Sequence, residues 1–133
     1  MSAGPTPSSA AESQPVSYRL FIVVPRRLNV EVGRFGRCEF PAGRYAYVGS
    51  ARRNIEARLR RHRGEGRRAL HWHIDYLLTQ PGVRISAIDT FATPECELVR
   101  MTAGRVVVPG FGASDCRLGC GSHLRYFGRG RAT

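Results

Sequence analysis

Several short stretches of the chain alternate apolar and polar side chains, the pattern of β-strands that turn one face toward a core. Residues 18–24, YRLFIVV, form an aromatic and β-branched run that ends at Pro25 and predicts a first, central strand. Residues 44–48 alternate in the same way, which places Tyr45 and Tyr47 on one face of a second strand. Strands are therefore expected in the middle of the fold.

Three other stretches complete the predicted strands. Residues 29–40, NVEVGRFGRCEF, contain two alternating pieces and predict an extra hairpin. Residues 83–92, VRISAIDTFA, predict a third strand. Residues 105–112, RVVVPGFG, predict a short apolar strand followed by a glycine turn.

A helical repeat replaces the alternation between residues 52 and 62. A helix there would place Ile55, Leu59, Arg58 and His62 on one side. A charge beside an apolar stripe requires a partner or a function. Two explanations stay open, a functional arginine and histidine, or an arginine that extends toward solvent beside a hydrogen-bonded histidine.

Residues 69–80, ALHWHIDYLLTQ, predict a second helix, because apolar side chains recur three and four positions apart. The stripe places His73 on the buried face, where a histidine is more often a hydrogen-bonded core residue than a catalyst. His71 and Asp75 share another face, so His71 is expected to pair with Asp75 or to contact phosphate. His71 and His73 point in different directions and are not expected to hold one metal ion together.

A third helix is expected near the end of the predicted strand at residues 83–92. Thr93 can cap it, Pro94 suits its first position, and Glu95 suits its first turn.

Strands that alternate with helices in a chain of 133 residues predict one α/β domain, a small mixed β-sheet flanked by helices, over residues 16–128. Residues 1–15, MSAGPTPSSAAESQP, are small and polar with prolines, and are expected to form a disordered tail. Residues 129–133 are expected to form a short C-terminal tail.

Charge narrows the expected partners. The chain has 21 basic against 10 acidic residues, a net charge of +11 that favours polyanions such as nucleic acid. No run approaches the roughly 20 apolar residues of a membrane span, and no basic and apolar secretory signal is present, so a cytoplasmic protein without a membrane partner is expected. The four cysteines are then expected as thiols or ligands.

Five runs in one order carry a family resemblance: YAYVGSA, RLRRHR, HWHIDYLL, CELV and FGASDC with SHLRYF. Together, over about residues 17–127, they resemble the small uncharacterised branch of the GIY-YIG nuclease superfamily. In the second half of the signature, a strand that ends in tyrosine and glycine leads into a helix that carries an arginine. Here Tyr47 to Gly49 resemble the strand end, and Arg58 and His62 follow on the expected helix. Tyr18 takes the tyrosine position of the first motif half, but Val16 and Ser17 replace its glycine and aliphatic residue.

The resemblance implies an α/β endonuclease that hydrolyses phosphodiester bonds in DNA, in the setting of DNA repair. Tyr18 and Tyr47 would line the site of the attacking water, one of them acting as base. Arg58 would contact the scissile phosphate, and His62 would orient it or assist proton transfer. The candidate catalytic residues are Tyr18, Tyr47, Arg58, His62 and His73.

The resemblance also implies one divalent metal ion, Mg²⁺ or Mn²⁺, held by a helical glutamate. Glu97 in the run CELV takes this place, and Glu95 is its alternative two positions earlier. A third reading is that both acids only favour the positive N-terminus of the helix.

Basic side chains around the predicted helices are the candidates for binding nucleic acid, DNA rather than RNA. They are Arg52, Arg53, Arg61, Arg67, Arg68 and His71. Arg53, Arg60 and Arg61 are expected on the solvent face of their helix. A non-catalytic nucleic-acid-binding module with the same fold is the second function class, and the weakened first motif half favours it.

The C-terminal tail of the resemblance contains a possible structural site. Cys116, Cys120 and His123 have spacings that zinc accepts, and Cys96 could complete the set. The usual paired spacing is absent, and the resemblance implies no zinc. Magnesium rather than zinc is therefore the expected metal, and buried polar side chains that satisfy backbone groups are the simpler explanation of the tail.

Overall fold

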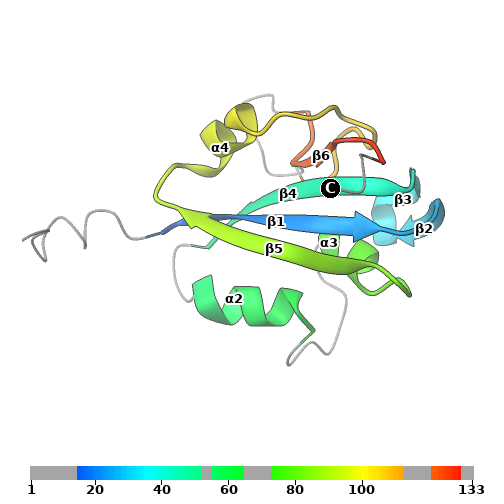
Figure 1. Cartoon of the computed structure of the whole chain (residues 1–133), viewed down its shortest axis with the longest axis horizontal. Coiled ribbons are helices and arrows are strands. Elements are labelled where there is room, and N and C mark those ends of the chain that lie inside the picture. Colours follow the sequence, from blue (N-terminus) through cyan, green and yellow to red (C-terminus); the bar gives the residue numbers. More distant parts are fainter. Residues whose placement is uncertain (1–14, 52–54, 65–72, 113–120, 130–133) are drawn as a thin grey trace, which may run out of the picture.

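The computed structural model describes residues 15–51, 55–64, 73–112 and 121–129. Four strands form its central sheet in the order β5-β1-β4-β6, and a hairpin of β2 and β3 forms a second sheet (Figure 1). The strands are β1 (Ser17–Val24), β2 (Leu28–Val32), β3 (Gly36–Phe40), β4 (Gly43–Ser50), β5 (Arg84–Phe91) and β6 (Leu124–Tyr126). The helices are the 3-10 turn η1 (Gly33–Phe35), α2 (Ile55–His62), α3 (His73–Leu78) and α4 (Glu95–Met101).

Strand β1 lies between β4 and β5, which confirms the predicted central strand. Its alternate side chains Tyr18, Leu20, Ile22 and Val24 are each exposed by 1% or less. The run YRLFIVV forms this strand because β-branched and aromatic side chains pack well on a pleated surface. One face of β1 is therefore the centre of the core.

The register between β1 and β4 fixes which side chains meet across the sheet. The two strands pair antiparallel with Tyr18 opposite Gly49. A Cβ atom added at Gly49 would lie 2.4 Å from both Cζ and the hydroxyl oxygen of Tyr18. Only glycine at position 49 therefore lets the Tyr18 ring cross β4.

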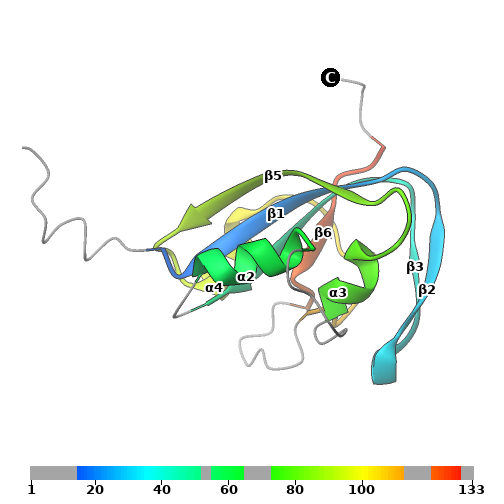
Figure 2. The same ribbon diagram turned by 90° about the horizontal axis from the view of Figure 1, so that it is seen from below.

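Helices cover the central sheet on both sides, with α2 and α4 opposite one another in Figure 1. Leu59 of α2 and Leu77 of α3 pack into the large core on the Tyr18 side, and Figure 2 shows these two helices on the same side of the strands. Leu98 and Val99 of α4 pack against Val48 in a second, smaller cluster. The sheet thus separates two apolar layers.

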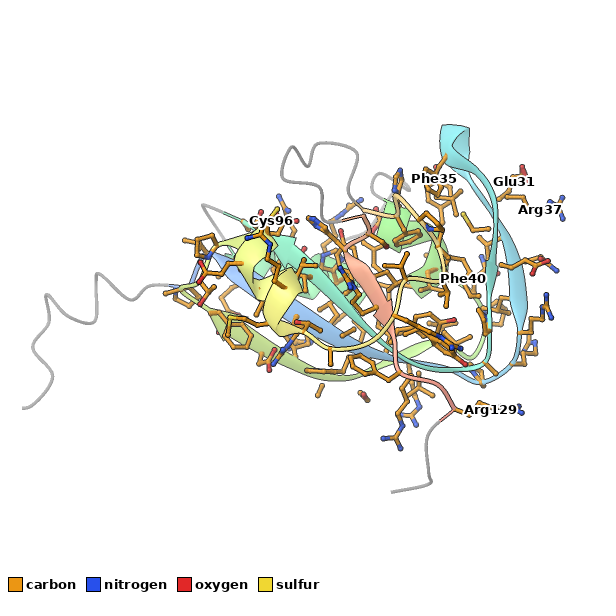
Figure 3. All side chains as sticks on the ribbon, turned by 90° about the horizontal axis from the view of Figure 1, so that it is seen from above. Glu31, Phe35, Arg37, Phe40, Cys96 and Arg129 are labelled. Carbon is orange, nitrogen blue, oxygen red and sulfur yellow. The ribbon has the colours of Figure 1, made fainter. Side chains whose placement is uncertain are left out.

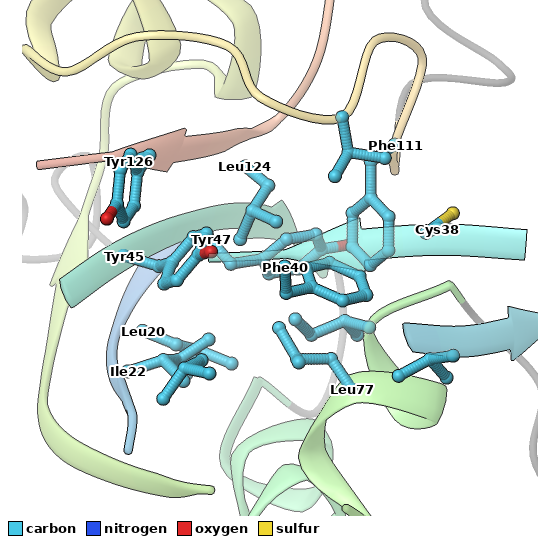
Figure 4. Packing of buried hydrophobic residues seen from close by; sticks show 14 of the residues in the cluster. Leu20, Ile22, Cys38, Phe40, Tyr45, Tyr47, Leu77, Phe111, Leu124 and Tyr126 are labelled. Atoms are coloured by element: carbon cyan, nitrogen blue, oxygen red, sulfur yellow. The ribbon is translucent and has the colours of Figure 1, made fainter. Parts of the chain in front are cut away.

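Aromatic rings join the remote segments of the large core (Figure 4). The Phe111 ring meets the rings of Phe40 and Tyr47 edge to face, with centroids 5.6 and 6.3 Å apart. Such edge-to-face pairs are favoured by the quadrupole of aromatic rings. They hold the segment that carries Phe111 against β4.

The α/β class and the extra hairpin at residues 29–40 are confirmed, but two details of the expected strands are wrong. Every strand pair in the described ranges is antiparallel, so the sheet is not mixed. The short strand expected before the glycine turn is reduced to one isolated bridge between Arg105 and Tyr126. The expected turn forms at Pro109, which lacks an N–H, and Gly110, which has φ of 81°, so a ladder cannot extend past residue 108.

Two further expectations change around β5 and α4. The pairing of β5 with β1 shifts between Ala87 and Ile85, so Ser86 is an extra, bulged residue and the expected alternation breaks there. Helix α4 has Pro94 rather than Thr93 at its N-cap, and no side-chain hydroxyl caps it.

As for membranes, the helices in the described ranges are all too short or too polar to span one.

Candidate active site at the end of strands β1 and β4

A buried tyrosine and histidine meet where β1 begins. The Tyr18 hydroxyl lies 2.7 Å from Nε2 of His62, the last residue of α2, and both side chains are buried. The Tyr47 ring approaches the same imidazole edge-on, with centroids 6.4 Å apart. Helix α2 therefore brings one imidazole to both predicted tyrosines.

Arg58 lies one helical turn before His62 and reaches the end of β4. Its Nη1 donates a 2.6 Å hydrogen bond to the Ser50 carbonyl oxygen. Its guanidinium also hydrogen-bonds Tyr18, and its positive charge lowers the pKa of Glu95. Arg58 is thus the cation around which the other polar groups are arranged.

Glu95, the first residue of α4, reaches the same strand end from the other side of the sheet. Its Oε1 accepts a 2.6 Å hydrogen bond from the Ser50 hydroxyl, and its Oε2 lies 2.6 Å from Nδ1 of buried His123. His123 is held beside β4 because its carbonyl oxygen accepts from the Val48 N–H at 2.9 Å. Ser50 therefore contacts Arg58 through its backbone and Glu95 through its side chain.

Burial and charge set the ionisation of these groups. Burial raises the pKa of Tyr18 to about 12, although the Arg58 charge opposes the shift. Burial also raises the pKa of Tyr47 well above its ordinary value. Burial alone would raise the pKa of Glu95, but the hydrogen bonds from His123 and Ser50 and the charges of His123 and Arg58 hold it below its ordinary value. At neutral pH the tyrosines are phenols and Glu95 is a carboxylate.

We call Tyr18, Tyr47, Arg58, His62 and Glu95 with Ser50 and His123 the polar end of the sheet. A phenol beside an imidazole can pass on a proton, a guanidinium can bind a phosphate, and a carboxylate can hold a hard cation. The combination suits chemistry on a phosphate ester.

The two candidate glutamates have different surroundings. Glu95 is half-buried among the groups of the polar end, whereas Glu97 on the next part of α4 is exposed. The difference follows from helix geometry, because residues two apart point about 200° apart around the axis. The structure therefore places Glu95, the alternative, where Glu97 was expected.

His73 lies outside the polar end. Its Nδ1 accepts a 2.8 Å hydrogen bond from the Gly112 N–H, and its ring lies between Phe35 and Phe111, with centroids 4.5 and 5.5 Å away. Burial lowers the pKa of His73 below its ordinary value. Its contacts are those of a neutral ring that fixes the segment behind Tyr47.

Arg61 does not lie on the solvent face of α2 as expected. Its Nη2 lies 3.0 Å from Oδ2 of Asp75, a carboxylate that is completely buried, and only 24% of the Arg61 side chain is exposed. Sequence spacing suggests His71 as a partner of Asp75, and His71 lies outside the described residues. The ion pair with Arg61 joins α2 to α3.

The other predicted nucleic-acid contacts, Arg52, Arg53, Arg67, Arg68 and His71, lie outside the described residues, as do Cys116 and Cys120 of the possible zinc site. Of the remaining zinc candidates, Cys96 is half-buried on α4 and His123 contacts Glu95. Within the described ranges, no three His, Cys, Asp or Glu side chains gather into a group that could hold a zinc ion.

Ser50 and His123 complete the polar end. The sequence predicts His123 only as a possible zinc ligand and does not mark Ser50 as a site residue. His123 could have been found from its position in the run SHLRYF, directly before β6, because β6 pairs with β4. That pairing places the C-terminal segment beside the strand that ends in Ser50.

Comparisons with known proteins give one match. The family described as "Domain of unknown function DUF123" matches residues 17–133. Searches among curated proteins and among solved structures found no match.

Proposed function

The chain belongs to the family of the domain of unknown function DUF123, and we propose that it is a metal-dependent endonuclease that hydrolyses phosphodiester bonds in DNA. One observation carries the proposal: Tyr18, Arg58, His62 and Glu95, from β1, α2 and α4, converge on the end of β4. The resemblance of Tyr18, Arg58 and His62 to the GIY-YIG nuclease signature supports it, as does the net charge of +11.

Proton transfer begins at the pair of Tyr18 and His62. Because burial raises the pKa of Tyr18 to about 12, its phenol does not ionise by itself at neutral pH. Nε2 of His62 lies 2.7 Å from the hydroxyl and can accept its proton when Nδ1 carries the ring hydrogen. As an attacking water loses a proton to the Tyr18 oxygen, the Tyr18 proton passes to Nε2. The pair thereby acts as one base, and no isolated phenolate forms.

Arg58 supplies positive charge to the phosphate. Its guanidinium already donates to the Ser50 carbonyl oxygen, which fixes its direction. The guanidinium N–H groups can donate to non-bridging phosphate oxygens, where negative charge increases as water attacks. Tyr47, buried against His62, closes the apolar side of the site.

Glu95 fits a metal ion that takes one protein carboxylate. Mg²⁺ usually keeps several waters and binds through one or two carboxylates together with substrate phosphate. The low pKa of Glu95 keeps it ionised, and contacts with Ser50 and His123 orient its two oxygens as partners of ligating carboxylates do. Mg²⁺ or Mn²⁺ bound there would neutralise charge on the phosphate and the leaving oxygen.

A second candidate function is a nucleic-acid-binding module without catalysis. The burial of both Tyr18 and Tyr47 favours it, because buried phenols with raised pKa can also be ordinary core residues. In that case Arg58 and α2 would only dock on phosphates, and binding would weaken steeply with salt.

The test is cleavage of labelled single-stranded, duplex, flapped and branched DNA in Mg²⁺ or Mn²⁺. Glu95→Gln is expected to lower the rate at least about 100-fold, because it removes the carboxylate that holds the metal. Glu97→Gln is the matched control, since it removes the same charge from the exposed face of α4, and we expect less than a twofold change. Binding without cleavage under either metal would favour the module, and equal losses in both variants would refute the assignment of Glu95.

A further inference from the structure

A groove lies on the sheet at the opposite end of β1 from Tyr18. It has a volume of about 510 Å³ and crosses β1, β4 and β5. The residues that matter in its lining are Phe21, Val23, Arg44, Arg84, Ala87 and Phe127. Figure 3 shows α4 over one end of the strands, with no helix over the end that leads toward Arg129. We call this feature the sheet groove.

Side-chain size explains the hollow. Across the sheet, Phe21 pairs with Ala46 of β4 and Ala87 of β5, so small side chains lie on both sides of its ring. The bulge at Ser86 bends β5 next to this row, and the Ser86 hydroxyl donates to the Phe21 carbonyl oxygen at 3.2 Å. Phe127, after β6, forms another wall and is 42% exposed. Two aromatic rings therefore border a space of molecular size.

Arginines border the same space. Val23 pairs with Arg44 on one side and Arg84 on the other, so one row of the sheet reads arginine, valine, arginine. Neighbouring strands are about 4.8 Å apart, which puts the two arginine Cα atoms roughly 10 Å from each other. Both side chains are exposed, and the groove lining contains no carboxylate. The surface is suited to an anion with flat, apolar parts.

We propose that the sheet groove binds a single-stranded segment of nucleic acid, with bases against Phe127 and Phe21 and phosphates at Arg44 and Arg84. Aromatic platforms flanked by basic side chains bind single strands in this way, because every base has a face for stacking. In a duplex the base faces are covered by their neighbours and cannot enter such a groove. The groove is a separate site from the polar end, since Val23 is five residue steps along β1 from Tyr18, a distance of about 17 Å.

An acidic protein segment is the competing occupant, and the geometry disfavours it. Carboxylates would pair with Arg44 and Arg84 but leave the exposed Phe127 ring without a flat partner, while the Arg19 guanidinium already lies 5.1 Å from the Phe21 ring centroid. The proposal shares a polyanionic partner with the proposed nuclease but does not depend on cleavage. Its test therefore measures binding alone.

The experiment is fluorescence anisotropy of the full chain with a short labelled oligothymidylate at about 0.15 M salt. The double variant Arg44→Gln and Arg84→Gln is expected to weaken binding about tenfold and to reduce the salt slope by about 0.7 per lost phosphate contact. Phe127→Ala is expected to weaken binding at least about fivefold through lost stacking. The matched control is Arg27→Gln with Arg37→Gln, which removes the same charge from the exposed hairpin, and we expect less than a twofold change.

A crosslinking measurement locates the strand. Oligothymidylate carrying 5-iodouracil is expected to crosslink to Phe127 or Phe21 after irradiation. Crosslinks confined to α2, or equal losses in the groove and hairpin variants, would overturn the proposal. Poly-glutamate that displaces the oligonucleotide at equal concentration would overturn it in favour of an acidic protein. Glu97→Gln, on the exposed face of α4, is expected to bind as the wild type does, whether or not the wild type cuts DNA.

Discussion

The two ends of the β1–β4 strand pair have opposite properties. At one end Tyr18 faces Gly49, and the polar groups around them are buried and hydrogen-bonded to one another. At the other end Val23 faces Arg44, and the sheet groove is open with exposed arginines. One uninterrupted register therefore supports a closed cluster of reactive groups at one end and an open basic surface at the other.

The contrast depends on what covers each end. Helix α2 and the start of α4 flank the polar end from the two sides of the sheet, whereas the groove is lined by strand residues and Phe127 and by no helix of the described ranges. Burial strengthens electrostatic interactions and shifts pKa values, which chemistry requires. Exposed arginines keep much of their hydration, which suits a partner of variable shape. Substitutions should accordingly affect chemistry at one end and binding at the other.

The largest expected effect is on DNA cleavage, and it distinguishes the buried hydroxyl of Tyr18 from that of Tyr45. Tyr18→Phe removes the hydroxyl that contacts His62, and we expect the rate of DNA cleavage to fall about 10²–10⁴-fold, the usual contribution of a general base. Tyr45→Phe removes a hydroxyl that donates to the Pro41 carbonyl oxygen at 2.5 Å. It should lower the free energy of unfolding by about 1 kcal/mol and leave cleavage unchanged.

Cleavage assays and denaturant unfolding of both variants make this comparison. Equal loss of cleavage in Tyr18→Phe and Tyr45→Phe would mean that the Tyr18 hydroxyl is structural, and the distinction between the two ends would then fail for catalysis.

The next effect concerns the buried ion pair behind the polar end. Arg61→Ala leaves the Asp75 carboxylate, which has no exposure, without this guanidinium, so the free energy of unfolding should fall by about 3 kcal/mol. Adding Asp75→Asn should recover much of that loss, because the charge is removed. The exposed pair of Arg27 and Glu39 is the control, and Arg27→Ala should cost less than about 1 kcal/mol. Urea unfolding at neutral pH measures all of these free energies. Equal losses in Arg61→Ala and Arg27→Ala would contradict the burial of the Arg61–Asp75 ion pair.

Glycines at the two ends of β4 sharpen the comparison. Gly49→Ala would push the Tyr18 ring from its place, so we expect loss of cleavage with a cost of about 1–3 kcal/mol in unfolding free energy. Gly43 has φ of 146°, and its added Cβ would lie 2.5 Å from the Gly128 carbonyl oxygen, so Gly43→Ala should destabilise at least as much. The folded fraction of Gly43→Ala should nevertheless cut DNA at the wild-type rate. A cleavage rate normalised to folded protein tests this, and an active Gly49→Ala would refute the role of the Tyr18 position.

The smallest expected effect is a pH dependence at His73. Burial lowers its pKa, so between that value and the ordinary value near 6.5 the unfolded chain binds the proton that the folded chain refuses. Stability from this residue is therefore present above about pH 6.5 and is lost as the pH falls below it. His73→Gln keeps an acceptor for the Gly112 N–H but cannot titrate. Between pH 7.5 and 5 the free energy of unfolding should fall less in His73→Gln than in the wild type. Parallel plots of this free energy against pH would contradict the burial of the His73 ring.

Local patterns in the sequence predicted the elements because each depends on neighbouring residues. Alternation gave β1, the hairpin and β4, and helical spacing placed Arg58 and His62 on one side of α2. The resemblance nominated Tyr18, Tyr47 and both glutamates. The short strand expected at the start of residues 105–112 is reduced to one bridge at Arg105, whereas the expected turn forms at Pro109 and Gly110.

Other contacts join residues that are remote in the chain, and no local pattern contains them. The ion pair of Asp75 with Arg61 joins two different helices. His123 reached Glu95 only because β6 pairs with β4. The sheet groove was not expected either, because Arg44 and Arg84 are far apart in the chain.

The sequence by itself determined the strands, the helices and the residue types from which a phosphate site can be made, since these follow from periodicity, backbone preference and charge. The tertiary structure alone decided that Glu95 rather than Glu97 joins Tyr18 and Arg58, that Asp75 belongs to Arg61, and that two arginines flank Val23. The physical reason is that strand register and helix packing set distances between residues remote in the chain. Glu95 and Glu97 are only two positions apart, yet the first carboxylate is half-buried and the second is exposed, a difference that composition does not predict.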